Sequence, residues 1–535
     1  MNAPSLSPAG FSLLHTYGAA FLSAGAWGLA LGYGVWPLAW GAFVPLWAAW
    51  MHRPCSPSQV LTHTVGPALL AYGGAFLLAY PWVLGHATRA GTQAGLSALL
   101  LLSALYSLPL MAGGRFAVRG QLAAGLAVWG GGWLLVDLLL QRGPWAFPWA
   151  LGAHALVDSP GTAFWVRAVG PSAAPVCIGA AHAVMLCLLR VARPRMAGGM
   201  ARGTQWGGCG GAAAVVLGGL GLIGGLSLLH PASHAEVAAS PASRPASSKA
   251  APVVWAVQPH LSPTAWSHAA NADRARQLHA LTSAALDSAA VRPDLVVWPE
   301  TALHPPDTLG LQARVRRWGV AVLTGAVLPA PRGAPAVTNS ALLYRPDAPV
   351  QRYDKRHLVP FAEAVPGASW WGALRRLTMP SSSARRYIRG SGPARFVHPT
   401  LPLVPLICFE SLAAPLPAAR PPDRSTAHGL VTIAQTGWWE RALPARQHVR
   451  YSRLRALETG QPLLVASVSG PVTLVAPSGA ATALTDFGER TVARMRWPAS
   501  RAPGRYVRTA PYTDIAWTAI GLLLVCIPVF RTSFR

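Results

Sequence analysis

The sequence predicts a multi-pass α-helical membrane domain of about eight transmembrane helices, joined to an α/β domain whose sheets are buried under helices. Of its 535 residues, 52% are hydrophobic and only 12% are charged, and the mean hydropathy is +0.34. That composition is too apolar for an ordinary soluble enzyme. The apolar residues are concentrated at the start: residues 1–230 contain only two acids, Asp137 and Asp158. Alternating strand and helix patterns begin only near Val253.

Seven apolar stretches in residues 1–230 are long enough to cross about 30 Å of hydrocarbon. Their cores are Phe11–Leu31, Val35–Trp50, Val60–Leu84, Ala94–Met111, Leu122–Leu140, Pro171–Leu189 and Cys209–Leu229. An eighth stretch runs from Ile515 to Phe530. We therefore expect residues 1–230 to form a domain of about seven transmembrane helices, and residues 513–535 to form a C-terminal transmembrane helix with a short basic tail.

The arginines between these stretches predict the orientation of the chain. If the amino terminus is cytoplasmic, the cytoplasmic loops are rich in arginine and the opposite loops are poor in it, which is the positive-inside pattern. The cytoplasmic set is Arg53, Arg115, Arg119, Arg190, Arg193, Arg195, Arg202, Arg531 and Arg535, and the opposite set is Arg89, Arg142 and Arg167. This orientation predicts a bacterial inner-membrane protein with residues 253–512 on the periplasmic side. No cleavable signal peptide is expected, because the amino terminus lacks a basic region.

The net charge of +26 does not indicate a nucleic-acid partner. The arginines are scattered, and no helix-turn-helix, zinc-finger or RNA-binding signature accompanies them. The positive-inside orientation of the membrane helices explains part of this positive charge better than a nucleic-acid partner does. The histidines are isolated and no Cys/His spacing suits a metal, so no metal or other cofactor is expected.

Residues 231–252 are rich in Ala, Ser and Pro and predict a flexible linker. Residues 253–512 then show short apolar runs typical of buried strands, between longer helical segments. This alternation predicts an α/β sandwich. The expected strands are Val253–Gln258, Leu295–Trp298, Ala321–Thr324, Ser340–Tyr344, Val404–Ile407, Leu430–Ile433 and Leu463–Val468, and the expected helices are Ala269–Ala289, Leu309–Trp318 and Gln447–Glu458.

Three short segments of this domain carry chemistry at strand edges: Val296–Ala302 contains Glu300, Tyr353–Phe361 contains Lys355, and Leu406–Ser411 contains Cys408. A partly desolvated Glu300 has a raised pKa and can act as general base and then general acid toward a thiol. Lys355 supplies a positive charge for an oxyanion, worth roughly 3 to 4 kcal/mol of barrier. Cys408 follows a strand and opens a turn into a helix, which lifts its thiol toward solvent. Together they predict acyl transfer through a thioester.

Each of these residues has an ordinary interpretation when taken alone. A Trp-Pro-Glu sequence usually ends a strand, a lysine before a histidine is most often a solvated charge, and a buried cysteine is most often a small apolar residue. Their conjunction, about fifty residues apart and each at a strand edge, is what predicts a site. Cys408 is also the only cysteine of the predicted outer domain, since the others are Cys55, Cys177, Cys187, Cys209 and Cys526. A structural disulfide is therefore not expected for it.

The three segments resemble the carbon-nitrogen hydrolase (nitrilase) superfamily, and with the membrane helices the chain resembles the apolipoprotein N-acyltransferase family. The resemblance covers essentially the whole chain. It includes Gly143–Gly152, which is similar to a loop between the family's membrane helices, Val257-Gln258 at the domain entry, His357–Pro366, and Gln447–Pro462 in a late helix. The resemblance implies a nitrilase-like α-β-β-α sandwich as the catalytic domain.

The resemblance also implies a ping-pong reaction. Cys408 would take an acyl chain from a glycerophospholipid, and the α-amine of a diacylglyceryl-cysteine apolipoprotein would attack the thioester. Glu300 resembles the family's base and Lys355 its oxyanion partner, while Glu363 resembles a second carboxylate that orients Lys355 or stabilises the intermediate. Phe409 and Glu410 match the pair after the nucleophile. Trp266 matches an aromatic lid residue once a gap is allowed, with plain packing as its other interpretation.

Two segments depart from the family pattern. Gln435-Thr436 stands where the family commonly has Asn-Asp, and Val465-Ala466-Ser467-Val468 stands where it commonly has an Arg-Ala-Thr-Asn-like stretch. These departures leave two other functions open. One is a related acyltransferase or amidase paralog that serves a conjugation or secretion system. The other is a non-catalytic membrane component of such a system, which the retention of Glu300, Lys355 and Cys408 argues against.

Overall fold

The structure is a computed structural model. It describes residues 8–51, 57–85, 89–142, 146–192, 251–261, 268–330, 336–360, 362–364, 387–392, 395–413, 429–439 and 441–533. The predicted membrane helix Cys209–Leu229 and the predicted linker at 231–252 lie outside these residues, as does Trp266.

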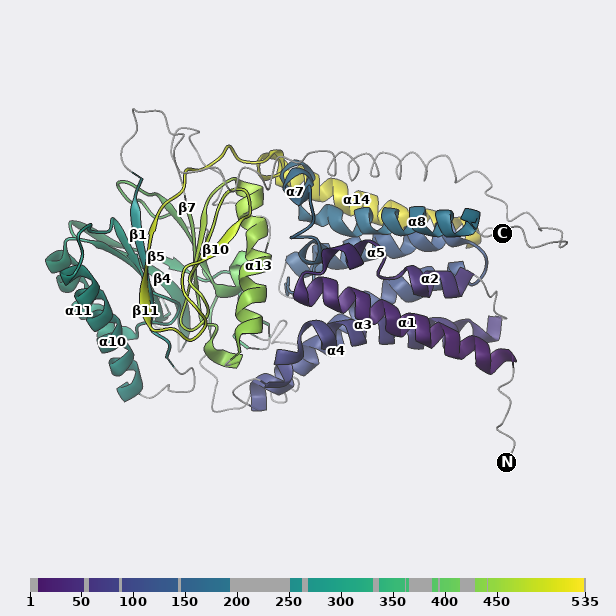
Figure 1. Cartoon of the computed structure of the whole chain (residues 1–535), viewed down its shortest axis with the longest axis horizontal. Coiled ribbons are helices and arrows are strands. Elements are labelled where there is room, and N and C mark those ends of the chain that lie inside the picture. The colour runs from purple at the N-terminus through teal and green to yellow at the C-terminus, as the bar shows by residue number, and fades with distance from the viewer. Residues whose placement is uncertain are drawn as a thin grey trace.

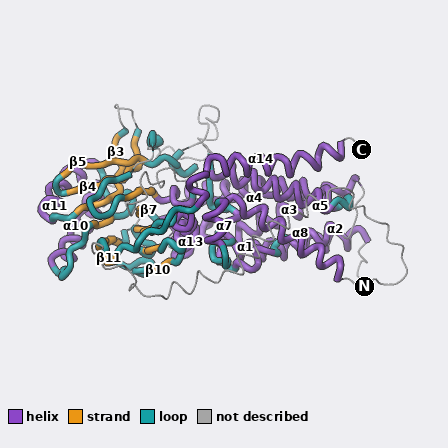
Figure 2. Tube along the Cα trace, turned by 90° about the horizontal axis from the view of Figure 1, so that it is seen from above, coloured by secondary structure: helices purple, strands orange, loops and turns teal. Residues whose placement is uncertain are grey.

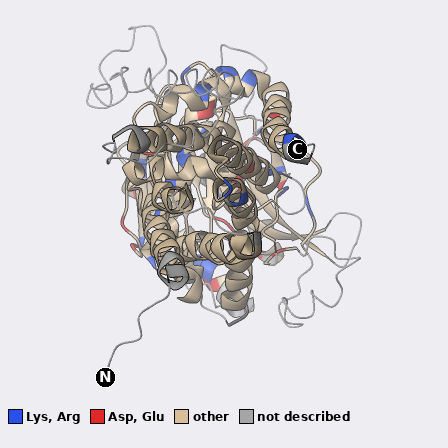
Figure 3. Ribbon diagram, turned by 90° about the vertical axis from the view of Figure 1, so that its right-hand side faces the viewer, with Lys and Arg blue, Asp and Glu red and all other residues tan. Residues whose placement is uncertain are grey.

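The chain folds into a helical bundle and an α/β sandwich that lie end to end (Figures 1 and 2). The bundle contains α1 (Pro8–Tyr33), α2 (Val44–Met51), α3 (Val60–Ala79), α4 (Arg89–Ala117), α5 (Leu122–Gln141), α6 (Gly152–Ala155), α7 (Thr162–Val169), α8 (Ala174–Ala192) and α14 (Arg505–Ser533). Within the described residues, five segments are helical, long and apolar enough to cross a membrane: 60–79, 91–117, 122–141, 171–189 and 505–531. Viewed from the bundle end, charged residues are sparse on these helices (Figure 3).

The predicted second membrane helix, Val35–Trp50, is wrong. This segment is a short 3-10 helix, η1 (Trp36–Trp40), followed by a turn and by α2. Proline lacks a backbone N–H and disfavours the interior of a helix, and both Pro37 and Pro45 lie in this segment. The break is stabilised from another helix, because Nε2 of the buried His182 accepts a hydrogen bond of 2.9 Å from the backbone N–H of Phe43.

The sandwich contains two mixed sheets. Its strands are β1 (Val253–Gln258), β2 (Leu295–Val297), β3 (Ala321–Pro329), β4 (Val337–Arg345), β5 (Ala348–Asp354), β6 (Leu403–Ile407), β7 (Gly429–Ala434), β8 (Leu463–Ser467), β9 (Thr473–Val475), β10 (Ala481–Ala483) and β11 (Thr491–Arg496). The first sheet has the order β11-β1-β2-β3-β4-β5 and the second has the order β10-β9-β8-β7-β6. Strands β1, β2 and β3 are parallel, as are β6, β7 and β8.

Helices cover both outer faces of the paired sheets, which confirms the predicted α-β-β-α sandwich. Helices α10 (His268–Asp287) and α11 (Pro305–Trp318) cover the first sheet, and α13 (Ala442–Thr459) covers the second. Inward-facing side chains such as Leu295 and Val431 form the core between the two sheets. All seven predicted strands and all three predicted helices are present, with shifted ends in most, whereas β5, β9, β10 and β11 were not predicted.

Helix α13 lies between the second sheet and the bundle, and its side chains bind the ends of two bundle helices. Nε2 of Gln447 donates to the carbonyls of Gly32 (2.9 Å) and Ala79 (2.7 Å), and Oε1 accepts from Nε1 of Trp82 (2.7 Å). The hydroxyl of Tyr451 donates to the carbonyl of Leu31 (2.8 Å). The last carbonyls of a helix have no partner within the helix, so these bonds join the sandwich to the C-terminal ends of α1 and α3.

Candidate active site

Glu300 follows β2 in a turn whose backbone packs closely against β3. The backbone N–H of Gly325 on β3 donates to the carbonyl of Pro299 (3.1 Å), and a Cβ on Gly325 would lie 2.6 Å from Cα of Glu300. Any side chain at Gly325 would therefore displace Glu300. Thr301 adopts a left-handed φ of 52°, and its carbonyl accepts a hydrogen bond from Nη1 of the buried Arg274 (3.2 Å).

The carboxylate of Glu300 is buried, with 4% of the residue exposed. Oε1 accepts a hydrogen bond from Nδ2 of Asn339 (2.7 Å), and Oε2 accepts one from the backbone N–H of Gln435 (2.7 Å). Burial raises the pKa of Glu300, while the Lys355 charge and these two bonds oppose the shift. A carboxylate with a raised pKa is suited to accept a proton from a thiol and return it.

Lys355 directly follows β5, and its 1% exposure makes it a buried cation. Nζ lies 2.8 Å from Oε1 of Glu363 and 3.6 Å from Oε1 of Glu300. Burial alone would favour the neutral amine, but the carboxylates of Glu363 and Glu300 outweigh it and raise the pKa of Lys355. The ammonium therefore stays charged near neutral pH.

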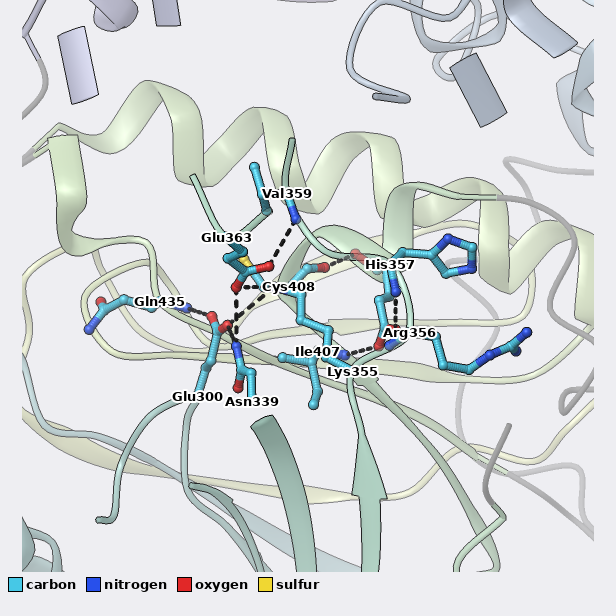
Figure 4. A network of polar contacts seen from close by, with 12 residues as sticks. Glu300, Asn339, Lys355, Arg356, His357, Val359, Glu363, Ile407, Cys408 and Gln435 are labelled. Atoms are coloured by element: carbon cyan, nitrogen blue, oxygen red, sulfur yellow. Dashed lines mark hydrogen bonds and ion pairs between the residues drawn. The ribbon is translucent and has the colours of Figure 1, made fainter. Parts of the chain in front are cut away.

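Glu363 is held against Lys355 by its own loop. Its Oε2 accepts a hydrogen bond from the backbone N–H of Val359 (2.9 Å), and Oε1 also accepts one from Nδ2 of Asn339 (3.3 Å). Asn339 on β4 thus bridges the two carboxylates, as the dashed lines of Figure 4 show. The structure brings the predicted second carboxylate into contact with the predicted lysine.

Cys408 is the first residue after β6 and opens the 3-10 helix η8 (Cys408–Leu412), which agrees with the predicted turn into a helix. Its φ of 51° lies in the left-handed region that non-glycine residues rarely adopt. Burial raises the pKa of the Cys408 thiol, Glu300 raises it further, and Lys355 opposes them. The resting group is therefore a thiol, so a base is needed to form the thiolate. Figure 4 shows Cys408 beside this charged cluster.

Glu410 ties the Cys408 turn to the segment around Lys355. This buried carboxylate accepts hydrogen bonds from the backbone N–H groups of Ile407 (2.9 Å), Arg356 (2.7 Å) and His357 (3.2 Å) and from the hydroxyl of Tyr353 (2.8 Å). Burial raises its pKa, and these bonds oppose the shift. Because it contacts backbone groups beside both Lys355 and Cys408, Glu410 fixes their spacing.

Phe409 points toward the bundle, away from the sandwich core. Its ring lies 5.6 Å from that of Phe147, in the segment between α5 and α6, and both belong to the hydrophobic core of the bundle. The predicted site therefore lies on the side of the sandwich that faces the bundle. Trp266, the other predicted aromatic residue, lies outside the described residues.

Gln435 and Thr436 lie beside Glu300 in a segment of hydrogen-bonded polar groups. Gln435 contacts Glu300 through its backbone, and its Oε1 accepts a hydrogen bond from the N–H of Gly437 (3.1 Å). The hydroxyl of Thr436 is hydrogen-bonded to that of Ser467 and accepts a bond from the N–H of Gly470 (2.8 Å). Gln435 and Thr436 therefore lie in a local network of hydrogen bonds.

Sequence reasoning missed Asn339, Tyr353 and the Gln435 amide. Asn339 had a detectable signal in the sequence, because its polar side chain directly precedes the strand predicted at Ser340–Tyr344. The Gln435 contact had none, because a backbone N–H is present at every residue other than proline. Among the described residues, no group of three or more His, Cys, Asp and Glu side chains is placed to hold a metal ion. The cysteines within the described ranges, Cys177, Cys187, Cys408 and Cys526, are free thiols.

No family model matches the sequence. Among curated proteins, the chain is 29% identical to an apolipoprotein N-acyltransferase of Verminephrobacter eiseniae over 484 residues, covering 84% of this chain and 83% of the relative. It is 29% identical to one of Rhizobium meliloti, covering 48% and 49%, and 35% identical to one of Ralstonia nicotianae, covering 35% and 37%. The matches to the latter two thus span half or less of those relatives' length.

Among solved structures, the chain is similar to a CN-hydrolase superfamily protein from Xanthomonas campestris, with 17% identity and a TM-score of 0.35. The match covers 51% of this chain and 97% of that one. An amidase from Nesterenkonia sp. has 15% identity and a TM-score of 0.35, covering 50% and 97%.

Proposed function

Because this chain is related in sequence to the apolipoprotein N-acyltransferases, we propose that it is a membrane N-acyltransferase of lipoprotein maturation. The acyl donor is a glycerophospholipid, and the acceptor is the N-terminal amine of a diacylglyceryl-cysteine apolipoprotein. One observation carries the proposal. A half-buried Cys408 with a left-handed backbone lies beside a lysine paired with two carboxylates, on the side of the sandwich that faces apolar helices.

In the first half-reaction, Glu300 accepts the thiol proton as the sulfur of Cys408 attacks the ester carbonyl of the phospholipid. The negative charge that develops on the carbonyl oxygen is stabilised by the ammonium of Lys355, which the carboxylates of Glu363 and Glu300 hold in place. The intermediate collapses to a thioester. Glu300 returns its proton to the departing alcohol of the lysophospholipid.

In the second half-reaction, the neutral α-amine of the lipid-modified cysteine attacks the thioester carbonyl. Glu300 takes a proton from the attacking nitrogen, Lys355 again stabilises the oxyanion, and the thiol of Cys408 departs with that proton. The products are an amide and the free enzyme. Both substrates are lipids, and each buried methylene is worth about 0.8 kcal/mol, so a nucleophile that faces the bundle suits substrates that stay in the bilayer.

The arrangement of the bundle supports an inner-membrane protein whose catalytic domain lies on the periplasmic side. The start of α1 and the end of α14 lie at the end of the bundle far from the sandwich (Figure 1). These two helix ends therefore lie on the face opposite the sandwich, which supports the cytoplasmic side that the arginine distribution predicts for them. We propose that residues 253–512 form this catalytic domain and that residues 1–230 and 513–535 anchor it.

Trapping the thioester tests this proposal. The purified full-length chain is incubated with a phospholipid that carries a labelled acyl group, and hydroxylamine-sensitive label on the Cys408 peptide is measured. We expect label on the wild type and none on Cys408→Ala. Addition of a diacylglyceryl-cysteine peptide should transfer the label to its amine. A labelled Cys408 with no transfer would favour the paralog with another acceptor, and an unlabelled Cys408 would contradict the proposal.

A further inference from the structure

The main chain at Cys408 is held in an unfavourable conformation. Cys408 has a left-handed φ of 51°. At a residue other than glycine, this conformation is unfavourable and persists only when surrounding contacts hold it in place. The direction of the Cys408 side chain depends on this backbone conformation. The groups that hold the Cys408 peptide in place therefore decide where the thiol points.

The Cys408 carbonyl is held by two donors. Nε2 of His448 lies 3.0 Å from this oxygen, and the Ser411 hydroxyl donates to it across 3.0 Å. A carbonyl can only accept a hydrogen bond, so Nε2 of His448 carries the proton. The same Nε2 lies 3.1 Å from the Ser411 hydroxyl, so His448 holds the Cys408 carbonyl and the hydroxyl that donates to it.

Ser452 adds further contacts around His448 and Ser411. The Ser452 hydroxyl lies 2.7 Å from both the carbonyl of His448 and the Ser411 hydroxyl, and it donates its single proton to one of them. The residue is buried, and its Nδ1 has no hydrogen-bond partner among the described residues. Burial lowers the pKa of His448 to about 4, and the Lys355 charge lowers it too. The ring therefore stays neutral at physiological pH.

His448 also links the nucleophile to the membrane helices. The preceding residue, Gln447, is bonded to the carbonyls of Gly32 and Ala79 at the ends of α1 and α3. Successive residues of a helix point in different directions, and here Gln447 contacts the bundle while His448 contacts Cys408. One turn of α13 thus contacts both the bundle and the nucleophile.

We propose that His448 is a positioning residue that fixes the left-handed backbone of Cys408 and so aims its thiol at Glu300 and Lys355. It does so through the Nε2–H group and does not exchange protons with the substrate. This inference rests on the proposed function for its role in acyl transfer. Its effect on the thiol itself is independent of the substrate.

The pair His448→Gln and His448→Asn tests this geometry. The amide of Gln reaches about as far as Nε2 of histidine, whereas that of Asn reaches only about as far as Nδ1. The rate of Cys408 alkylation by iodoacetamide, read by mass spectrometry of the Cys408 peptide, is measured in the detergent-solubilised full chain. We expect His448→Asn to slow alkylation about tenfold, which corresponds to one lost hydrogen bond, and His448→Gln to stay near the wild type.

The same two changes at His398 form the matched control. His398 is buried in the same domain and contacts the carbonyl of Asp294 (3.2 Å), so its variants should change melting temperature without separating in alkylation rate. Equal alkylation rates for His448→Asn, His448→Gln and the wild type would overturn the inference, and so would equal slowing of both variants. If His448→Asn does not fold, Ser411→Ala takes its place, and an unchanged rate for it would also overturn the inference.

Thioester formation is measured in parallel, with the labelled phospholipid. If alkylation separates the two His448 variants but the wild type forms no thioester, the proposed function fails and the positioning role stands. If the wild type forms the thioester but the two variants do not differ in either measurement, the positioning role fails alone.

Discussion

The backbone N–H of Gln435 lies 2.7 Å from Oε2 of Glu300. This contact links the end of β7 in the second sheet to the turn after β2 in the first sheet. It belongs to the main chain, so it does not depend on the side chain at position 435. A change of side chain at this position therefore leaves this contact to Glu300 intact.

Replacement of Gln435 by alanine should consequently leave thioester formation within about threefold of the wild type. The side chain loses only its bond to the N–H of Gly437 (3.1 Å), which is worth about 1 kcal/mol of stability. The measurement is the initial rate of acyl labelling at Cys408. A loss as deep as that of Cys408→Ala would show that the Gln435 side chain, and not its backbone, serves the reaction.

Glu300→Gln should lower the rate of thioester formation by about 100-fold or more, the usual range for loss of a general base. An amide cannot accept the thiol proton. Folding should persist, because the glutamine carbonyl can still accept from one of the two donors, Asn339 and Gln435. Labelling at Cys408 measures the rate and a melting curve measures folding. A variant that folds and reacts at the wild-type rate would exclude Glu300 as the base.

The raised pKa of Glu300 also predicts a pH-dependent effect on stability. A carboxyl whose folded pKa lies above its unfolded value of about 4.3 contributes stability that is full below that value and is lost as pH rises through the folded pKa. The melting temperature of Glu300→Gln relative to that of the wild type should therefore be highest at pH 7 and should fall toward pH 4. Melting curves across this range measure it, and a difference that grows toward acid would contradict the sign.

Lys355→Met should abolish acyl labelling and destabilise the fold by about 3 to 5 kcal/mol, because it leaves the buried carboxylate of Glu300 and the partly buried one of Glu363 without their cation. Glu363 is the nearer of the two, at 2.8 Å. The double variant Lys355→Met/Glu363→Gln should recover part of the melting temperature and none of the activity. Recovery of labelling in the double variant would show that Lys355 balances charge without stabilising the oxyanion.

Gln447→Leu should lower the free energy of unfolding by about 3 kcal/mol, since it removes three buried hydrogen bonds of about 1 kcal/mol each. Arg446→Leu is the matched control on the same helix, because Arg446 is exposed. Its melting temperature should stay close to that of the wild type. Equal melting temperatures for the two variants would mean that Gln447 does not join the sandwich to the bundle.

The local pattern of apolar residues was sufficient to predict the buried strands, but it was insufficient to predict the strands at the edges of the sheets. β1 has the predicted bounds, because a buried strand reads as a continuous apolar run. β5 was missed because it is an edge strand, paired on one side and partly exposed, so polar residues such as Gln351 and Arg352 interrupt its pattern. The predicted helix Val35–Trp50 failed because hydropathy does not register the prolines that break it.

The division into apolar helices and an α/β sandwich could be predicted from the sequence, and so could the positions of Glu300, Lys355 and Cys408 at strand ends. These features follow from hydrophobic periodicity and short motifs, which are local along the chain. Three contacts became apparent only in the folded protein: Asn339 bridges Glu300 and Glu363, the backbone N–H of Gln435 donates to Glu300, and His448 holds the Cys408 carbonyl. Such contacts join residues far apart in sequence through groups that many residues share, so they arise only when the two sheets and α13 pack together.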